Sequence, residues 1–273
     1  MKKFELTSEF NLNFFGRKFF RIKALVNIER YGVKAGDLGG WVEKEDNLSQ
    51  SGNAWVSGNA KVSGNAEVSG NAEVSGNAKV YGNAKVYGNA EVSGNAKVSG
   101  NAWVSGNAEV SGNAKVYGNA EVSGNAKVSG NAGVSGNAEV SGNAKVSGNA
   151  KVSGGAKVSG NAEVSGNAEV SGNAWVYGNA EVSGNAKVYG NAKVSGDADY
   201  AVIKGFGTVY RPTTFFRCHD GEARVTCGCF YGTIDEFREQ VKRTRKGKVA
   251  DEYLKIADLM EYHFKKEDSG ENV

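Results

Sequence analysis

Side chains that could bind a metal ion gather near the end of the chain. Cys218, His219, Cys227 and Cys229 lie on two expected strands that an Asp220-Gly221 turn joins. Thiolate sulfur and imidazole nitrogen are the usual ligands of structural zinc, so these four residues are candidate metal ligands. Neighbouring residues of a strand point to opposite faces, however, which separates Cys218 from His219. We therefore favour buried, reduced thiols over a zinc site.

A basic cluster follows in the same part of the chain, at the expected end of a helix. Such a cluster could contact nucleic acid. Cations at the carboxyl end of a helix also complement its dipole, and this is the interpretation we favour. The cluster consists of Lys242, Arg243, Arg245, Lys246 and Lys248.

The middle of the chain is one uninterrupted repeat. Valine stands at every sixth position from Val56 to Val194, twenty-four times in all, in the unit Val-Ser/Tyr-Gly-Asn-Ala-x. A period of six forms no stripe on an α-helix. In a strand, Ala and Val would point inward and x outward, while Ser/Tyr, Gly and Asn would turn the corner. The repeat therefore predicts an all-β solenoid in which each unit is one short strand and one turn.

This unit resembles that of the hexapeptide-repeat family of left-handed β-helices, which has an aliphatic residue first, often Asn fourth and a small residue fifth. The resemblance covers about half of the chain. It implies three units per triangular coil, hence about eight coils in a left-handed parallel β-helix, and side-by-side homotrimers. Two short flanking segments, residues 33–42 and 227–230, also resemble parts of uncharacterised bacterial and prophage-encoded β-helix proteins, some of which carry a transferase label. This second likeness implies a phage or prophage origin.

Three regions follow from this pattern: an N-terminal capping segment at residues 1–50, the β-helix at 51–206, and a C-terminal α+β domain at 207–273. Aromatic pairs on both sides of Gly16-Arg17 predict a hairpin in the first region. Tyr200 and Phe206 keep the valine phase where the repeat decays, so we expect them to plug the end of the bore.

The C-terminal domain has its own local signals. We expect strands at 213–218 and 222–227, on either side of the turn. Thr233 and Glu236 form a capping box that predicts a helix start, and apolar spacing predicts a second helix over 250–264.

The outward x positions carry most of the variation within the coils. With eighteen residues per coil, one face would bear a row of lysines interrupted only by Gly133 and Glu169. Like charges about 5 Å apart in water repel by only about 0.8 kcal/mol before screening, so the row is tolerable for folding. It is either a solvated face or a binding surface, and Trp103 and Trp175 on another face are further candidates for contacts. The lysines are Lys61, Lys79, Lys97, Lys115, Lys151 and Lys187.

Composition indicates the setting. The formal net charge is only +3, so a partner must be met by a local patch of charge. No stretch resembles a secretory signal or approaches the ~20 apolar residues of a membrane span. Three cysteines are too few for a disulfide framework. We expect a cytoplasmic protein of a bacterial host with no membrane partner.

Known enzymes of the hexapeptide family, acyltransferases and γ-type carbonic anhydrases, need histidine on the coils. Here the two histidines, His219 and His263, lie outside the repeat, and no inserted loop forms a pocket. The leading hypothesis is a non-enzymatic structural or interaction protein without a cofactor, which presents charged rows and end domains to an unknown partner. The alternatives are a binding protein that sequesters a nucleotide or other anion, as a counter-defence factor would, and, more weakly, an acyltransferase relic.

Overall fold

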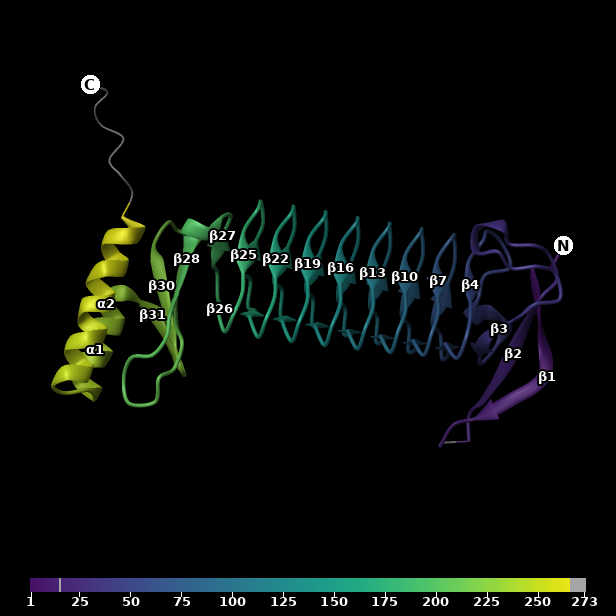
Figure 1. The fold of residues 1–273 in the computed structure, drawn as a ribbon, viewed down its shortest axis with the longest axis horizontal. Coiled ribbons are helices and arrows are strands. Elements are labelled where there is room, and N and C mark those ends of the chain that lie inside the picture. The colour runs from purple at the N-terminus through teal and green to yellow at the C-terminus, as the bar shows by residue number, and fades with distance from the viewer. Residues whose placement is uncertain (15, 266–273) are drawn as a thin grey trace, which may run out of the picture.

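A computed structural model describes residues 1–14 and 16–265. Figure 1 shows a straight rod of stacked coils, with a two-stranded hairpin at the N-terminal end and a small sheet and two helices at the other. The rod contains β4 (Trp55–Val56) to β27 (Lys193–Val194), each strand being the x-Val pair of one unit and starting six residues after the strand before it. The expected solenoid is confirmed.

The strands form three parallel sheets, one on each side of the coil. Strand β5 (Lys61–Val62) pairs with β8 (Lys79–Val80), eighteen residues on, and each sheet contains eight such strands from the repeat. Twenty-four units therefore make eight coils, as expected. Strand β3 (Leu38–Val42) and an isolated bridge from Leu48 to Val68 add a further turn in front of the first complete coil. The left-handed sense of winding stays a prediction.

The interior of the rod is a dry column of two residue types. Every valine from Val56 to Val194 is fully buried, and every alanine from Ala54 to Ala192 is at most 1% exposed. With three valines and three alanines in each coil, all coils have the same cross-section. Stability is then a sum of similar terms between neighbouring coils.

Glycine is required at the corners for two reasons. The corner glycines from Gly58 to Gly190 all have φ between 61° and 77°, a region that side chains with a Cβ disfavour. A Cβ on Gly124 would also lie only 2.9 Å from the backbone N and O of Gly142 in the next coil. The coils can therefore stack at β-sheet spacing only where this position lacks a side chain.

Asparagine forms ladders along the corners. In one corner the Nδ2 of each Asn donates to the Oδ1 of the Asn eighteen residues on, from Asn53 without interruption to Asn179. The ladder of another corner stops at Gly155, where a Cβ would meet the Oδ1 of Asn173 at 2.9 Å. Stacked amides thus stabilise the corners in the way that they stabilise cross-β structures.

Three of the backbone hydrogen bonds in each unit point toward the C-terminal end. The amide of Lys61 donates to the carbonyl of Ala78, and the amides of Ser57 and Asn59 donate to Val74 and Gly76 in the same direction. The first coil therefore presents carbonyl oxygens to whatever precedes it, and the last coil presents N–H groups. Both edges would need partners or solvent.

The N-terminal segment covers the carbonyl edge with donors. The Nζ of Lys3, only 4% exposed, donates to the carbonyl of Ala54 at 2.7 Å, and the Nδ2 of Asn47 donates to Gly64 and Ala66. Burial lowers the pKa of Lys3 to about 8. The elements of this segment are β1 (Phe4–Leu12), β2 (Lys18–Ala24), η1 (Glu29–Tyr31), β3 and η2 (Glu45–Asn47), and the expected hairpin around Gly16-Arg17 is confirmed.

The C-terminal end covers the N–H edge with acceptors. The carboxylate of Asp197, in η3 (Asp197–Asp199), accepts from the amide of Glu181 at 3.0 Å, and Asp199 accepts from the amide of Ser195 at 2.8 Å. The hydroxyl of Thr214 accepts from the amide of Lys187 in the same way. Each end is thus capped by groups of the polarity that its edge requires.

Beyond the last coil lies a four-stranded antiparallel sheet with two helices against it. The strands are β28 (Tyr200–Ile203), β29 (Thr213–Arg217), β30 (Ala223–Cys227) and β31 (Phe230–Thr233), and the helices are α1 (Ile234–Thr244) and α2 (Lys248–Phe264). The expected hairpin, the capping box of Thr233 with Glu236, and both helices are confirmed. Strands β28 and β31 were not anticipated.

The residues that close the C-terminal end of the solenoid core differ in part from those expected. Tyr200 packs against the end of the core, and its hydroxyl donates to the carbonyl of Glu181. Phe206 is 38% exposed, so its predicted role is wrong. Phe216 and Cys218, both buried, join the core column in its place. These two residues come from β29 and the bridge beyond it, which lie across the last coil.

Candidate functional site

Strand pairing places the lysines in one straight row on one side of the rod. Lys61, Lys79, Lys97 and Lys115 are direct neighbours in successive coils, and Gly133 follows them. The same sheet then continues through Lys151, Glu169 and Lys187. We call these six lysines the lysine row.

Ion pairs divide the lysine row into two parts. The carboxylate of Glu169 lies 3.8 Å from the Nζ of Lys151 and 3.4 Å from that of Lys187, so it offsets one of the two positive charges in the C-terminal part. Among the residues that the structure describes, none forms an ion pair with Lys61, Lys79, Lys97 or Lys115. These four, which we call the unpaired lysines, make a continuous cationic strip at the N-terminal half of the face.

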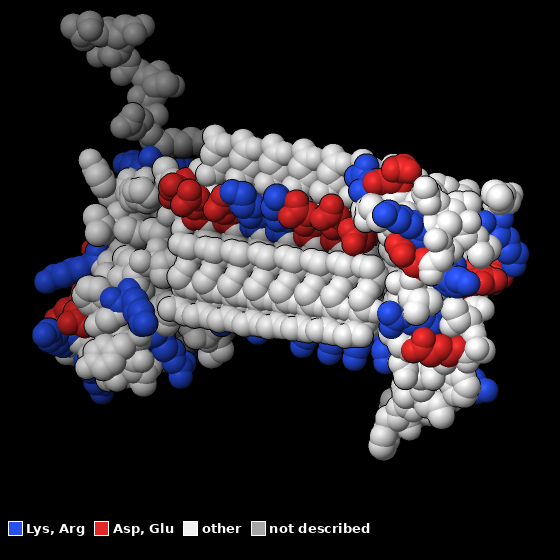
Figure 2. Space-filling model, turned by 45° about the vertical axis from the view of Figure 1, so that its right-hand side comes forward, with Lys and Arg blue, Asp and Glu red and all other residues white. Residues whose placement is uncertain are grey.

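On the other two sides of the rod, several lysines pair with glutamates of neighbouring coils. Figure 2 shows one of them as a row along the rod in which a blue stretch lies between two red stretches. On this side Lys127 pairs with Glu109 at 2.8 Å and Lys145 with Glu163 at 2.6 Å. Acidic and basic residues therefore meet between coils on both of these sides, although Glu73 and Glu91 are neighbours in successive coils and neither forms an ion pair among the described residues. The side with the lysine row differs in leaving a run of lysines uncompensated.

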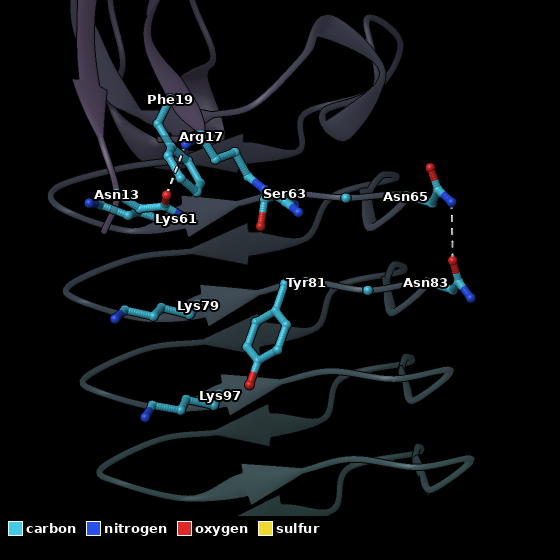
Figure 3. A pocket seen from close by; sticks show the side chains of 12 residues that line it. Asn13, Arg17, Phe19, Lys61, Ser63, Asn65, Lys79, Tyr81, Asn83 and Lys97 are labelled. Atoms are coloured by element: carbon cyan, nitrogen blue, oxygen red, sulfur yellow. Dashed lines mark hydrogen bonds between the residues drawn. The ribbon is translucent and has the colours of Figure 1, made fainter. Parts of the chain in front are cut away.

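The N-terminal hairpin overhangs the start of the lysine row and forms a cleft with it. The cleft has a volume of about 700 Å³, and Figure 3 shows its two walls, the hairpin tip and the first coils. The hairpin contributes Asn13, Arg17 and Phe19, and the coils contribute three of the unpaired lysines together with polar and aromatic corner residues. We call this space the hairpin cleft; its coil wall consists of Lys61, Ser63, Gly64, Asn65, Lys79, Tyr81, Gly82, Asn83 and Lys97.

Arg17 and Glu43 attach the hairpin to the first coil. The Nη1 of Arg17 lies 2.9 Å from the Oε2 of Glu43, which also accepts from the amide of Gly64 at 2.6 Å. The Nζ of Lys61 lies 5.3 Å from the centre of the Phe19 ring, a cation–π distance. The tip of the hairpin and the start of β2 are therefore held against the rod by these contacts.

Tyrosines stand at the corner beside the lysine row. Tyr81 and Tyr117 follow Val80 and Val116 of the same sheet and are 42% and 48% exposed. Figure 3 shows the Tyr81 ring between the lysine side chains and the hydrogen bond from Asn65 to Asn83. The third tyrosine of this corner, Tyr189, packs edge-on against Tyr231 of the C-terminal sheet and belongs to the cap.

The two candidate tryptophans lie elsewhere. Trp103 and Trp175 occupy the same sheet as each other but not that of the lysine row. Each is about 43–44% exposed and lies under the ammonium of the lysine of the preceding coil, Lys85 or Lys157, at 5.9 Å. They are therefore not part of the hairpin cleft.

The four candidate metal ligands are not brought together. Cys218 is buried in the end of the core, which raises its pKa to about 11, and the ring of His219 packs edge-on against Trp175 at 4.8 Å. Cys227 accepts a hydrogen bond from Thr213, and Cys229 is exposed. Over residues 1–14 and 16–265, no three His, Cys, Asp or Glu side chains are arranged to hold a metal ion.

The basic cluster of the C-terminal domain surrounds the end of α1 and the link to α2. Lys242 pairs with Glu239 at 2.8 Å, and Lys248 lies 3.8 Å from Glu252. Arg243 donates to Gln240 one turn earlier in the helix. Several of these cations are thus engaged by their own helices, as expected for a helix terminus.

The comparisons with known proteins supply no relative: neither the protein-family models nor the curated proteins contain a match to this chain. Within the described residues, neither helix combines the length and the apolar character needed to cross a bilayer.

Sequence reasoning missed the hairpin cleft and Arg17 as part of it. The turn at Gly16-Arg17 predicted the hairpin, but no local sequence signal indicated where the tip of the hairpin would lie relative to the rod.

Proposed function

We propose that this protein is a non-enzymatic interaction protein whose rigid rod presents the unpaired lysines and the hairpin cleft to an anionic partner. The observation that carries the proposal is the contrast between the three sides. On two sides the glutamates equal or outnumber the lysines and pair with several of them between coils, whereas the third side leaves Lys61, Lys79, Lys97 and Lys115 uncompensated next to a cleft. Complementary charge is what steers and orients a partner on such a surface.

The proposal extends to origin and assembly. The Val, Asn and Ala of the repeat support membership of the hexapeptide-repeat family, with left-handed winding and homotrimers, and the flanking segments support a phage or prophage setting in a bacterial cytoplasm. An acyltransferase relic receives least support, because both histidines lie outside the coils and His219 is packed against Trp175.

A second candidate function is sequestration of a nucleotide or other small anion. The hairpin cleft favours it, since about 700 Å³ lies within the usual range for small-molecule sites. This candidate differs from the first in needing only the cleft. It is distinguished by whether ATP, used as the probe, binds with an affinity that depends on Lys61 and Arg17 but not on Lys115.

Fluorescence anisotropy with three labelled polyanions tests the proposal: polyglutamate, polyphosphate and oligothymidylate. At least one should bind at low salt, and Lys79→Glu with Lys97→Glu should weaken it about 10- to 100-fold, as expected for loss of two cationic contacts. The matched control is Lys85→Glu with Lys193→Glu, which changes the net charge equally on another side. Absence of binding by all three, or equal losses in both variants, overturns the proposal.

A further inference from the structure

The unpaired lysines form a strip one residue wide, which limits the shape of the partner. From Lys61 to Lys115 there are three coil steps, or roughly 14 Å at ~4.8 Å per coil. The strip is longer than a single phosphate group needs, and it is straight. A duplex has two lines of phosphates separated by grooves, with a major groove about 12 Å wide, so only one of its strands could follow this row.

Aromatic rings accompany the strip. Tyr81 and Tyr117 stand at the corner next to it, two coils apart, which is roughly 10 Å at ~4.8 Å per coil. Serine occupies the same corner position in the coil between them, Ser99, so no third ring separates the two. Exposed rings at intervals beside a cationic row are what proteins use to stack unpaired bases. The Asp and Glu side chains of an acidic peptide have no rings that could stack on these tyrosines.

Amide groups complete the edge. Four Asn of this corner, Asn65, Asn83, Asn101 and Asn119, each use one N–H of the side chain to donate along the ladder. A side-chain amide has two N–H groups and an oxygen with two lone pairs, so capacity remains for base edges. The hairpin, with Arg17 and Phe19, closes the strip at its N-terminal end.

We infer that the partner is a single-stranded nucleic acid, whose phosphates follow the unpaired lysines, whose bases stack on Tyr81 and Tyr117, and whose end enters the hairpin cleft. The inference rests on the proposed function and specifies its partner. Sequence preference is not expected, because stacking on tyrosine and contact with lysine are open to every base.

The test uses a labelled single-stranded oligothymidylate of about 12 nucleotides, within the usual range of site sizes for proteins that bind single strands. We expect its affinity to fall with salt with a log–log slope of about −2.8, the value for four contacts on a single strand. The same sequence as a duplex should bind more weakly, since its bases are not free to stack.

The decisive variant is Tyr81→Ser with Tyr117→Ser, which introduces the residue that most units have at this corner and therefore leaves the coil intact. It should weaken oligothymidylate binding by about 30-fold or more, the effect of losing two base–aromatic stacks, and leave polyglutamate and polyphosphate binding unchanged. The matched control is Tyr87→Ser with Tyr177→Ser, at another corner. Equal losses in the two pairs would contradict the role of Tyr81 and Tyr117.

A gain-of-function variant guards against loss through misfolding. A Cβ on Gly133 would meet nothing within 4 Å, so Gly133→Lys extends the unpaired strip without disturbing the coil. It should tighten oligothymidylate binding and steepen the salt slope by about 0.7.

The outcomes separate the two claims. Lysine-dependent binding of polyglutamate or polyphosphate without binding of oligothymidylate overturns the inference and leaves the proposed function standing. Equal binding of single strand and duplex, with no effect of the tyrosine variant, also overturns the inference. Failure of every polyanion to bind overturns both.

Discussion

The stacking of coils on glycine can be tested with one substitution placed at two sites. Gly124 is a corner glycine with φ of 68°, whereas Gly133 occupies an outward x position in β17 (Gly133–Val134) with open space around it. Both become alanine. At Gly124 the left-handed backbone costs about 1–2 kcal/mol. The added Cβ would lie 2.9 Å from the backbone of Gly142, which strains the 2.7 Å bond from the amide of Asn125 to that carbonyl, a loss of about 1 kcal/mol.

The expected sum at Gly124 is a destabilisation of about 2–3 kcal/mol. At Gly133 alanine should stabilise the strand by about 0.5–1 kcal/mol, because glycine loses more backbone entropy on folding. Native-state hydrogen exchange read by mass spectrometry on peptides covering 115–150 measures the free energy of local opening, which suits a rod whose coils interact only with neighbours. If the two variants change protection equally, or Gly133→Ala is the more damaging, the corner argument is refuted.

Three further predictions concern the core and the two ends. Val122→Asp should unfold or split the rod because it buries an unpaired charge, whereas Glu121→Lys beside it should destabilise the rod by under about 1 kcal/mol. Circular dichroism during guanidinium titration compares the two variants, and equal destabilisation would contradict the assignment of Val122 as inward and Glu121 as outward. Removal of residues 1–48, or of the residues after Ser195, should expose an unpaired sheet edge and convert a discrete species into fibres or aggregates. If light scattering finds both truncated proteins monodisperse, the two segments do not act as caps of the rod. Burial lowers the pKa of Lys3 to about 8 in the folded protein, so protonation of Lys3 opposes folding at pH values below its unfolded pKa of about 10.4. As pH rises from 8 to 10.4, the free energy of unfolding of the wild type should therefore increase by at most about 3 kcal/mol relative to that of Lys3→Met. A difference in thermal midpoint that stays constant over this pH range would contradict the prediction.

The sequence by itself determined the coil. A six-residue period with Val and Ala two places apart admits only a strand with both residues inward, and Gly at each corner follows from the positive φ that the turn requires. The resemblance to the hexapeptide-repeat family, which implies three units per coil, added that each unit meets copies of itself eighteen residues away, and so it placed Val122 between Val104 and Val140. The same reasoning aligned Lys61 with Lys79. The capping box likewise predicted the start of α1 at Thr233, because its two residues, Thr233 and Glu236, lie within one helical turn.

The tertiary structure decided what surrounds the repeat. The sequence aligned Glu169 with the lysine row, but only the side-chain geometry shows that it pairs with Lys151 and Lys187 and so leaves four lysines unpaired. Phe216 rather than Phe206 ends the core, since a strand from beyond the repeat crosses the last coil. The tip of the hairpin is held at the first coil by contacts such as that of Arg17 with Glu43, twenty-six residues apart. These contacts join segments that share no period, so their positions depend on how the chain ends fold back on the rod, which local spacing does not encode.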